Sequence, residues 1–144
     1  MFVVDTNILL YAADREAPEY AVCRQLLEGW RTQAPAWHLT WGVIYEFLRV
    51  STHPRVWRRP WQIDEAWGFV EALLVSPGMS VLTETERHPD VTRQVLAAVS
   101  ALCGNFVFDV HTAVLMREHG IGRIYTRDTG FHRFPFIEVI DPLQ

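Results

Sequence analysis

Residues 2–10 of this chain are FVVDTNILL, an apolar run interrupted by an acid. The first part, Phe2-Val3-Val4, is short, continuous and rich in β-branched residues, which is typical of a buried strand in a parallel sheet. Asp5 follows directly, and the segment from Asn7 to Ala13 predicts a short helix. A strand that passes through one acid into a helix indicates an α/β fold, in which ligands bind beyond the carboxyl ends of the strands.

Two other apolar runs also lead to an aspartate. Phe106-Val107-Phe108 precedes Asp109, and Ile124-Tyr125 precedes Thr126-Arg127-Asp128. Each acid has a structural alternative, because Asp5 and Asp109 stand where a helix N-cap would stand and Asp128 opens an Asp-Thr-Gly turn. Three carboxylates at neighbouring strand ends would repel one another unless a cation neutralised them. Their joint occurrence therefore predicts a metal site.

The other elements alternate along the chain. We expect helices over Pro18 to Gln33, Trp41 to Ser51, Gln62 to Val75, Pro89 to Leu102 and Val110 to His119, and strands over Ala36 to Leu39, Met79 to Leu82, Asn105 to Asp109, Arg123 to Thr126 and, at an edge, Phe136 to Ile140. Such alternation predicts a mainly parallel central sheet covered by helices on both faces. With 144 residues and no linker or repeat, we expect one domain over 1–144.

Composition narrows the class of protein. A formal net charge of −4 argues against a broadly basic nucleic-acid-binding surface, and the 13 basic residues are all arginine, which we attribute to a compositionally skewed genome. The N-terminal run has no basic lead, and no long apolar stretch indicates a membrane span, so we expect a cytoplasmic protein. Cys23 and Cys103 lie far apart outside any metal-binding spacing, and we expect both to be core thiols.

A fourth acid, Glu46, lies on the expected helix from Trp41 to Ser51. On a helical wheel it borders the apolar arc that includes Val43 and Phe47, so its carboxylate could lean over the core. The alternative is a solvated glutamate paired with Arg49. Together with the three aspartates, Glu46 would complete a set of oxygen ligands of the kind that Mg²⁺ or Mn²⁺ takes.

These acids suit phosphodiester hydrolysis by a metal-activated water, which needs no histidine base. We expect Asp5, Glu46 and Asp109 to be metal ligands and Asp128 to bind the metal or orient a water. If its strand persists, Thr126 would share the face of Asp128 and could hydrogen-bond to that carboxylate.

Neighbouring polar residues could support the site or have simpler roles. Thr6 and Asn7 stand at a helix start that could hold a phosphate or a ligand carboxylate, although ordinary capping is the alternative. His111 and His132 lie near two of the acids, but a histidine in such a position is more often a surface or capping residue. Other catalytic templates fit poorly: the sequence has no glycine-rich phosphate loop and no G-x-S-x-G elbow, and Asn7 stands where a haloacid-dehalogenase phosphatase has its second aspartate.

Four segments, in order and spacing, resemble the PIN-domain ribonucleases, and in particular the VapC-type toxins. They are MFVVDTNILL from Met1, VIYEFLRV from Val43, FDVHTA from Phe108, and TRDTGF from Thr126. The resemblance implies a three-layer α/β/α fold, Mg²⁺- or Mn²⁺-dependent cleavage of RNA, a homodimer, and inhibition by a VapB-type antitoxin whose tail occupies the active-site groove. Carried over by motif, the acids are Asp5, Glu46, Asp109 and Asp128, and Thr126 matches the family's polar position before the last acid.

Alternatives remain at this stage. The chain could be a PIN-like nuclease that cuts DNA or structured RNA without an antitoxin, or a catalytically silent interaction module, which the presence of all four acids disfavours. A phosphoacceptor receiver domain is disfavoured by the helix-borne Glu46. The segment around Trp57, Trp61 and Trp67 is unusually aromatic. We expect Trp67 to pack in the core, while Trp57 and Trp61 could face an antitoxin or stack on a base.

Overall fold

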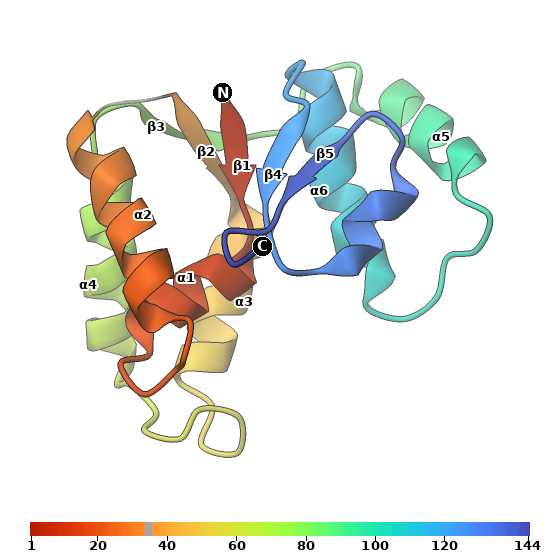
Figure 1. Ribbon diagram of the computed structural model, residues 1–144. Helices are drawn as coiled ribbons and strands as arrows, with labels where there is room; N and C mark the ends of the chain where they lie inside the picture. Colours follow the sequence, from red (N-terminus) through yellow and green to blue (C-terminus); the bar gives the residue numbers. More distant parts are fainter. Residues whose placement is uncertain (34–35) are drawn as a thin grey trace.

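A central sheet of parallel strands organises the molecule (Figure 1). The structure is a computed structural model that describes residues 1–33 and 36–144. Its five strands lie in the order β3 (Met79–Leu82), β2 (Trp37–Thr40), β1 (Phe2–Val4), β4 (Arg123–Tyr125) and β5 (Glu138–Ile140). All four neighbouring pairs are parallel, which confirms the predicted sheet.

Helices cover both faces of this sheet, so the three-layer α/β/α architecture is confirmed (Figure 1). One face carries α1 (Thr6–Ala13), α2 (Tyr20–Gln33), α3 (Trp41–Ser51) and α4 (Ile63–Leu74). The other carries α5 (His88–Ala98), α6 (Phe106–Glu118) and the short 3-10 helix η1 (Thr129–Arg133).

Strand β1 contributes side chains to the core on both faces of the sheet. Phe2 and Val4 pack with the α1–α4 layer, whereas Val3 between them packs with the α5–α6 layer. Both valines are fully buried. This is the alternation that a strand imposes on its side chains, and it explains why the run is apolar without interruption.

The strand order fixes where a ligand can bind. From β1 the chain continues to β2 on one side of it and later returns to β4 on the other, so the carboxyl ends of β1 and β4 flank the topological switch point. Asp5 N–H still donates to the Tyr125 carbonyl at 3.0 Å, which holds these two strand ends together. The residues that follow β1 and β4 therefore meet at one crevice.

The strand predicted over Asn105 to Asp109 is wrong, because this segment is the start of α6. Phe106, Val110 and Val114 follow one another at helical spacing and pack into the core, while Phe108 is 66% exposed. A short apolar run alone does not distinguish a strand from a helix, and here the helical contacts decide. Asp109 thus lies in the first turn of a helix and does not end a strand.

Other differences are smaller. The helix expected over Pro89 to Leu102 runs from His88 to Ala98. Cys23 is buried as expected, but Cys103 is exposed, so its assignment to the core is wrong. Among the described residues, no helix is long and apolar enough to cross a membrane.

Two of the tryptophans, Trp61 and Trp67, differ from the places that the sequence favoured. Trp67 is 36% exposed and does not belong to the buried core. Trp61, in contrast, packs edge-on against Phe47 and Phe69, with ring centroids 6.1 and 5.7 Å away. Its ring therefore serves the packing of α3 on α4.

Candidate active site

The four acids singled out in the sequence line one cavity at the switch point, with a volume of about 420 Å³. Asp5 follows β1, Glu46 lies on α3, Asp109 lies in the first turn of α6, and Asp128 precedes η1. Carboxylates from four separate parts of the fold thus lie around one cavity. The structure brings together every acid that the sequence indicated, and their roles as metal ligands stay predictions.

An adjoining cavity of about 460 Å³ extends the site along α3 and α6. It shares Asp5, Glu46 and Asp109 with the first cavity, and exposed aromatic rings of Tyr45 and Phe108 line it as well. Sequence reasoning missed both rings. The signal for Tyr45 was its place beside Glu46, whereas Phe108 was assigned to a buried strand.

Asp5 is the most firmly held of the acids. Its carboxylate accepts hydrogen bonds from Thr6 N–H at 2.7 Å, from Asn7 Nδ2 at 2.7 Å and from Thr126 Oγ1 at 2.6 Å. The first of these caps α1, so capping and site formation are both served by one side chain. Because donors hold both of its oxygens, the carboxylate has a fixed orientation toward the cavity.

Thr126 and Asn7 link Asp5 to the turn that carries Asp128. The Thr126 hydroxyl, which is fully buried, accepts from Asn7 Nδ2 at 2.9 Å and from the backbone N–H of Asp128 at 2.9 Å. Asn7 Oδ1 in turn accepts from Arg127 N–H at 3.1 Å. The predicted bond from Thr126 to the Asp128 carboxylate is wrong, because β4 ends at Tyr125 and the hydroxyl donates to Asp5 instead.

Glu46 is held more loosely. Its Oε2 accepts from the Thr6 hydroxyl at 3.0 Å, and its Oε1 lies 3.6 Å from Arg49 Nη2. About half of its side chain is exposed, so the ion pair with Arg49 is weak. Glu46 therefore fits both interpretations given above. It pairs with Arg49, and it also lines the cavity together with the other acids.

Asp109 and Asp128 meet over a glycine. A Cβ atom at Gly130 would lie 3.0 Å from Asp128 Oδ1 and 3.3 Å from Asp109 Oδ2. The Gly130 N–H also donates to Asp128 Oδ1 at 2.7 Å, which fixes that side chain. Gly130 is thus a site residue that the sequence indicated only as part of a turn, and its missing side chain lets the two carboxylates approach.

The electrostatics of the cavity favour a bound cation. Burial raises the pKa of Asp5 to about 6, although hydrogen bonds from Thr126 and Thr6 oppose the change. Burial also raises the pKa of Asp109 to about 7, and the charges of Asp128, Asp5 and Glu46 add to the effect. Burial is thus a larger cause of the raised pKa values than repulsion between the carboxylates.

The donor set fits a hard divalent ion. All four side chains offer carboxylate oxygens, which Mg²⁺ and Mn²⁺ prefer, and a cation would relieve the cost of ionising Asp5 and Asp109. No three of these acids bring their oxygens within 4.8 Å of one another in the described part of the chain. Such spacing leaves room for waters between a divalent ion and some of these carboxylates.

Comparisons with known proteins agree with this fold and site. The PIN domain family model matches residues 2–137. Ribonuclease VapC43 of Mycobacterium tuberculosis is 35% identical over 144 residues, covering all of this chain and 97% of the relative. Ribonuclease VapC48 of the same species is 31% identical over 140 residues, covering 97% of this chain and 96% of the relative.

A solved structure supports the fold independently. The VapBC complex of Salmonella typhimurium, bound to DNA, contains a chain that superposes with a TM-score of 0.67. The match covers 98% of this chain and 97% of that one at 14% identity, so it supports the fold alone. With the family match and the two ribonucleases taken together, the chain belongs to the PIN-domain family and, within it, to the VapC ribonucleases.

Proposed function

We propose that this chain is the toxin of a type II toxin-antitoxin pair, a single-domain endoribonuclease over 1–144 that hydrolyses RNA with Mg²⁺ or Mn²⁺. The observation that carries the proposal is the meeting of Asp5, Glu46, Asp109 and Asp128 in one cavity whose burial raises the pKa of two of them. These acids are well placed to bind a divalent ion and, through it, a phosphodiester.

Each residue has a distinct part in this proposal. Asp5, Glu46 and Asp109 would bind the ion, directly or through its bound waters, and Asp128 would bind it or orient a water. Thr126 and Asn7 hold the Asp5 carboxylate in place through their hydrogen bonds. When bound, the divalent ion supplies an activated water and neutralises charge on the phosphoryl oxygens.

The aromatic walls of the adjoining cavity suit a nucleic acid. Tyr45 is 67% exposed and Phe108 is 66% exposed, and both line the cavity that contains three of the acids. A base can stack on either ring while its phosphate lies at the carboxylates with the divalent ion. Recognition by stacking and by the ion explains how a chain with net charge −4 can act on RNA.

The same cavity accounts for control by an antitoxin. Without an ion, its carboxylates attract a cationic side chain, so an arginine or lysine on the tail of a VapB-type antitoxin inhibits by pairing with them. We further infer that the toxin is a homodimer and works in the cytoplasm, as the resemblance to VapC-type toxins implies. Removing the basic residues of the tail is expected to abolish inhibition, and full inhibition by such a tail would exclude this mode of control.

Cleavage of RNA by the purified protein tests the proposal. We expect cleavage with Mg²⁺ or Mn²⁺ and none with EDTA. The products should carry 5′-phosphate and 3′-hydroxyl ends, because a water is the nucleophile and the 3′ oxygen is the leaving group, as the resemblance to PIN nucleases implies. A single 2′-deoxy substitution at the scissile position should leave the chemistry intact. Cyclic-phosphate ends would contradict the mechanism, cleavage of DNA in preference to RNA would support the nuclease without an antitoxin, and no cleavage of either would support an interaction module.

A further inference from the structure

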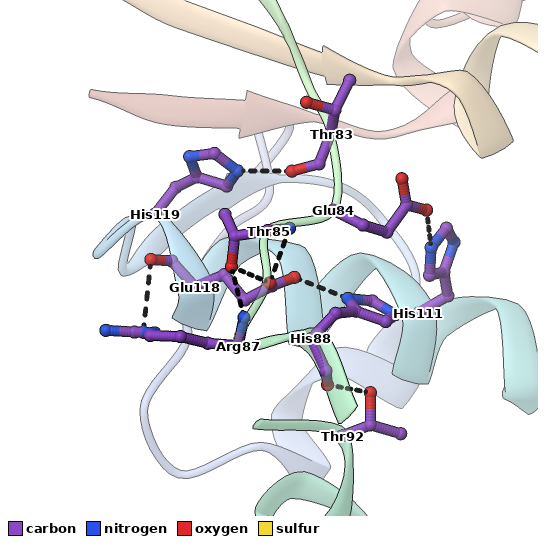
Figure 2. Close-up of polar contacts among 9 residues, drawn as sticks. All are labelled: Thr83, Glu84, Thr85, Arg87, His88, Thr92, His111, Glu118 and His119. Atoms are coloured by element: carbon purple, nitrogen blue, oxygen red, sulfur yellow. Dashed lines mark hydrogen bonds and ion pairs between the residues drawn. The ribbon is translucent and has the colours of Figure 1, made fainter. Parts of the chain in front are cut away.

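A second cluster of metal-ligating side chains, drawn in Figure 2, contains none of the four acids. Glu84, His88 and His111 each offer one ligand atom, and these atoms all lie within 4.8 Å of one another. Within the described residues, no other set of three acidic, histidine or cysteine side chains is so close. The three come from the segment between β3 and α5, from the start of α5, and from α6.

His88 is oriented by a buried carboxylate behind it. Its Nδ1 lies 2.6 Å from Glu118 Oε2, and the Glu118 side chain is fully buried. Glu118 itself accepts from the Thr85 N–H at 3.0 Å and from the Thr85 hydroxyl at 2.5 Å (Figure 2). Since Nδ1 is engaged, the ring presents Nε2 as its free donor atom. Metal-binding histidines are typically held in this way, with one nitrogen on a carboxylate and the other on the ion.

The other two ligands already lie side by side. His111 Nε2 is 2.9 Å from Glu84 Oε1, and the rings of His88 and His111 pack edge-on with centroids 5.7 Å apart. Two ligands of a tetrahedral Zn²⁺ ion lie about 3.3 Å apart when each is about 2 Å from the metal. Glu84 and His111 are 53% and 38% exposed at their side chains, so an ion can enter from solvent.

We propose that Glu84, His88 and His111 form a binding site for Zn²⁺ or a similar borderline metal ion, with a water in the open fourth position. Two imidazole nitrogens and one carboxylate are the donor set that Zn²⁺ takes in open sites, and they differ from the all-oxygen set of the four acids. The bound ion ties the segment before α5 to α6 and thereby fixes the helix whose first turn carries Asp109.

His111 connects the two places. Besides belonging to the cluster, it lines the cavity that contains Asp5, Glu46 and Asp109. Glu84 and His88 do not line that cavity. They can therefore be changed to test the second site without touching the acids.

Titration of the protein with ZnCl₂ in a calorimeter tests this proposal. We expect wild type to bind one Zn²⁺ at this site and Glu84→Gln and His88→Gln to weaken that binding at least about tenfold. Glu84→Gln guards against misfolding, because its side chain is exposed and its loss leaves the His88–Glu118 pair in place. His119→Gln is the matched control, since His119 lies nearby but its ring nitrogen Nε2 contacts the Thr83 carbonyl, at 2.7 Å, and not the cluster (Figure 2).

The acids supply a second control. Asp5→Asn alters the other site and is expected to leave the Zn²⁺ affinity of the cluster unchanged, whether or not the protein cleaves RNA. Co²⁺ should give the visible absorption of a tetrahedral nitrogen-oxygen site in wild type and not in His88→Gln. Equal Zn²⁺ affinity in wild type, Glu84→Gln and His88→Gln, or an equal loss in His119→Gln, would overturn the proposal.

Discussion

Carboxylate pKa values shift in opposite directions in the acid cavity and in the histidine cluster. In the cavity, Asp5 and Asp109 face other acids and have raised pKa values of about 6 and about 7. In the cluster, the pKa of Glu84 is lowered by its own backbone N–H and by His111. Burial would raise the pKa of Glu118, but hydrogen bonds from Thr85 and His88 outweigh it and lower the pKa.

This difference reflects how far neighbouring groups compensate the carboxylate charges in each place. The cluster satisfies its acids locally, because each glutamate has a histidine within 2.9 Å. The cavity leaves its acids short of positive charge. Arg49, 3.6 Å from Glu46, and Arg133, whose charge acts weakly on Asp109, are the exceptions among the described residues. An arrangement that costs folding free energy in the metal-free protein is one that a bound ion stabilises, which is typical of functional sites.

Replacing a proposed metal ligand should have the largest effect. We expect Asp5→Asn, Glu46→Gln and Asp109→Asn each to slow RNA cleavage at least about 100-fold at saturating Mg²⁺, because each removes charge that binds the ion. Asp128→Asn should be less severe. Single-turnover rates measure the effect. Asp90→Asn on α5 is the control, since that exposed acid pairs with Arg93 and does not line the cavity. Wild-type rates in any of the first three would remove that residue from the assignment.

Gly130→Ala should have an intermediate effect. The added methyl group would lie 3.0 Å from Asp128 Oδ1 and 3.3 Å from Asp109 Oδ2, so both carboxylates must move apart. We expect roughly tenfold slower cleavage and a higher Mg²⁺ requirement, a cost typical of a small displacement at a preorganised site. Gly68→Ala is the matched control, because nothing lies within 4 Å of its added Cβ. If the two variants cleave equally well, the approach of the carboxylates over Gly130 does not matter.

Stability should respond least, and its pH dependence has a definite sign. Because the pKa of Asp109 is raised to about 7, the folded protein holds this proton more tightly than the unfolded chain does. Ionisation therefore destabilises the fold progressively between about pH 4 and pH 7, and the cost is complete above that range. Asp109→Asn removes the cost, whose size is about 1–2 kcal/mol after solvent screening of a partly buried group.

Thermal unfolding in EDTA measures this stabilisation. At pH 8 Asp109→Asn should melt about 2–8 °C above wild type, and the difference should vanish toward pH 4. Mn²⁺ should raise the melting temperature of wild type more than that of the variant. Identical melting at pH 8, with and without EDTA, would mean that Asp109 does not share a site with the other acids.

Much of the fold was readable from local pattern. Phe2-Val3-Val4 was recognised because a strand buried on both faces needs apolar residues without a break, and the helix of Glu46 because Val43, Ile44 and Phe47 share one side. The strand predicted before Asp109 was wrong because the conformation of this segment depends on tertiary contacts. Phe106 stacks on Phe134, with centroids 5.5 Å apart, and no local rule reveals that partner.

Of the candidate site, the sequence predicted the acids but not the contacts that hold them. The acids could be found because each follows or borders an apolar segment, even where the segment was assigned to the wrong element. The Thr126 hydroxyl's true acceptor, Asp5, lies 121 residues away in sequence, so only the strand order brings them together. The histidine cluster went unnoticed for the same reason, since His111 lies 27 residues from Glu84 and no short motif joins them.

Binding of Mn²⁺, followed by the loss of the free-ion EPR signal, tests the central claim most directly. The acids are proposed to bind a hard divalent ion, whereas the histidine cluster is proposed to bind Zn²⁺, so the two sites should separate by variant. We predict that Asp109→Asn strongly weakens Mn²⁺ binding and that Glu84→Gln leaves it at the wild-type level. Mn²⁺ binding that survives in Asp109→Asn and is lost in Glu84→Gln would contradict the account.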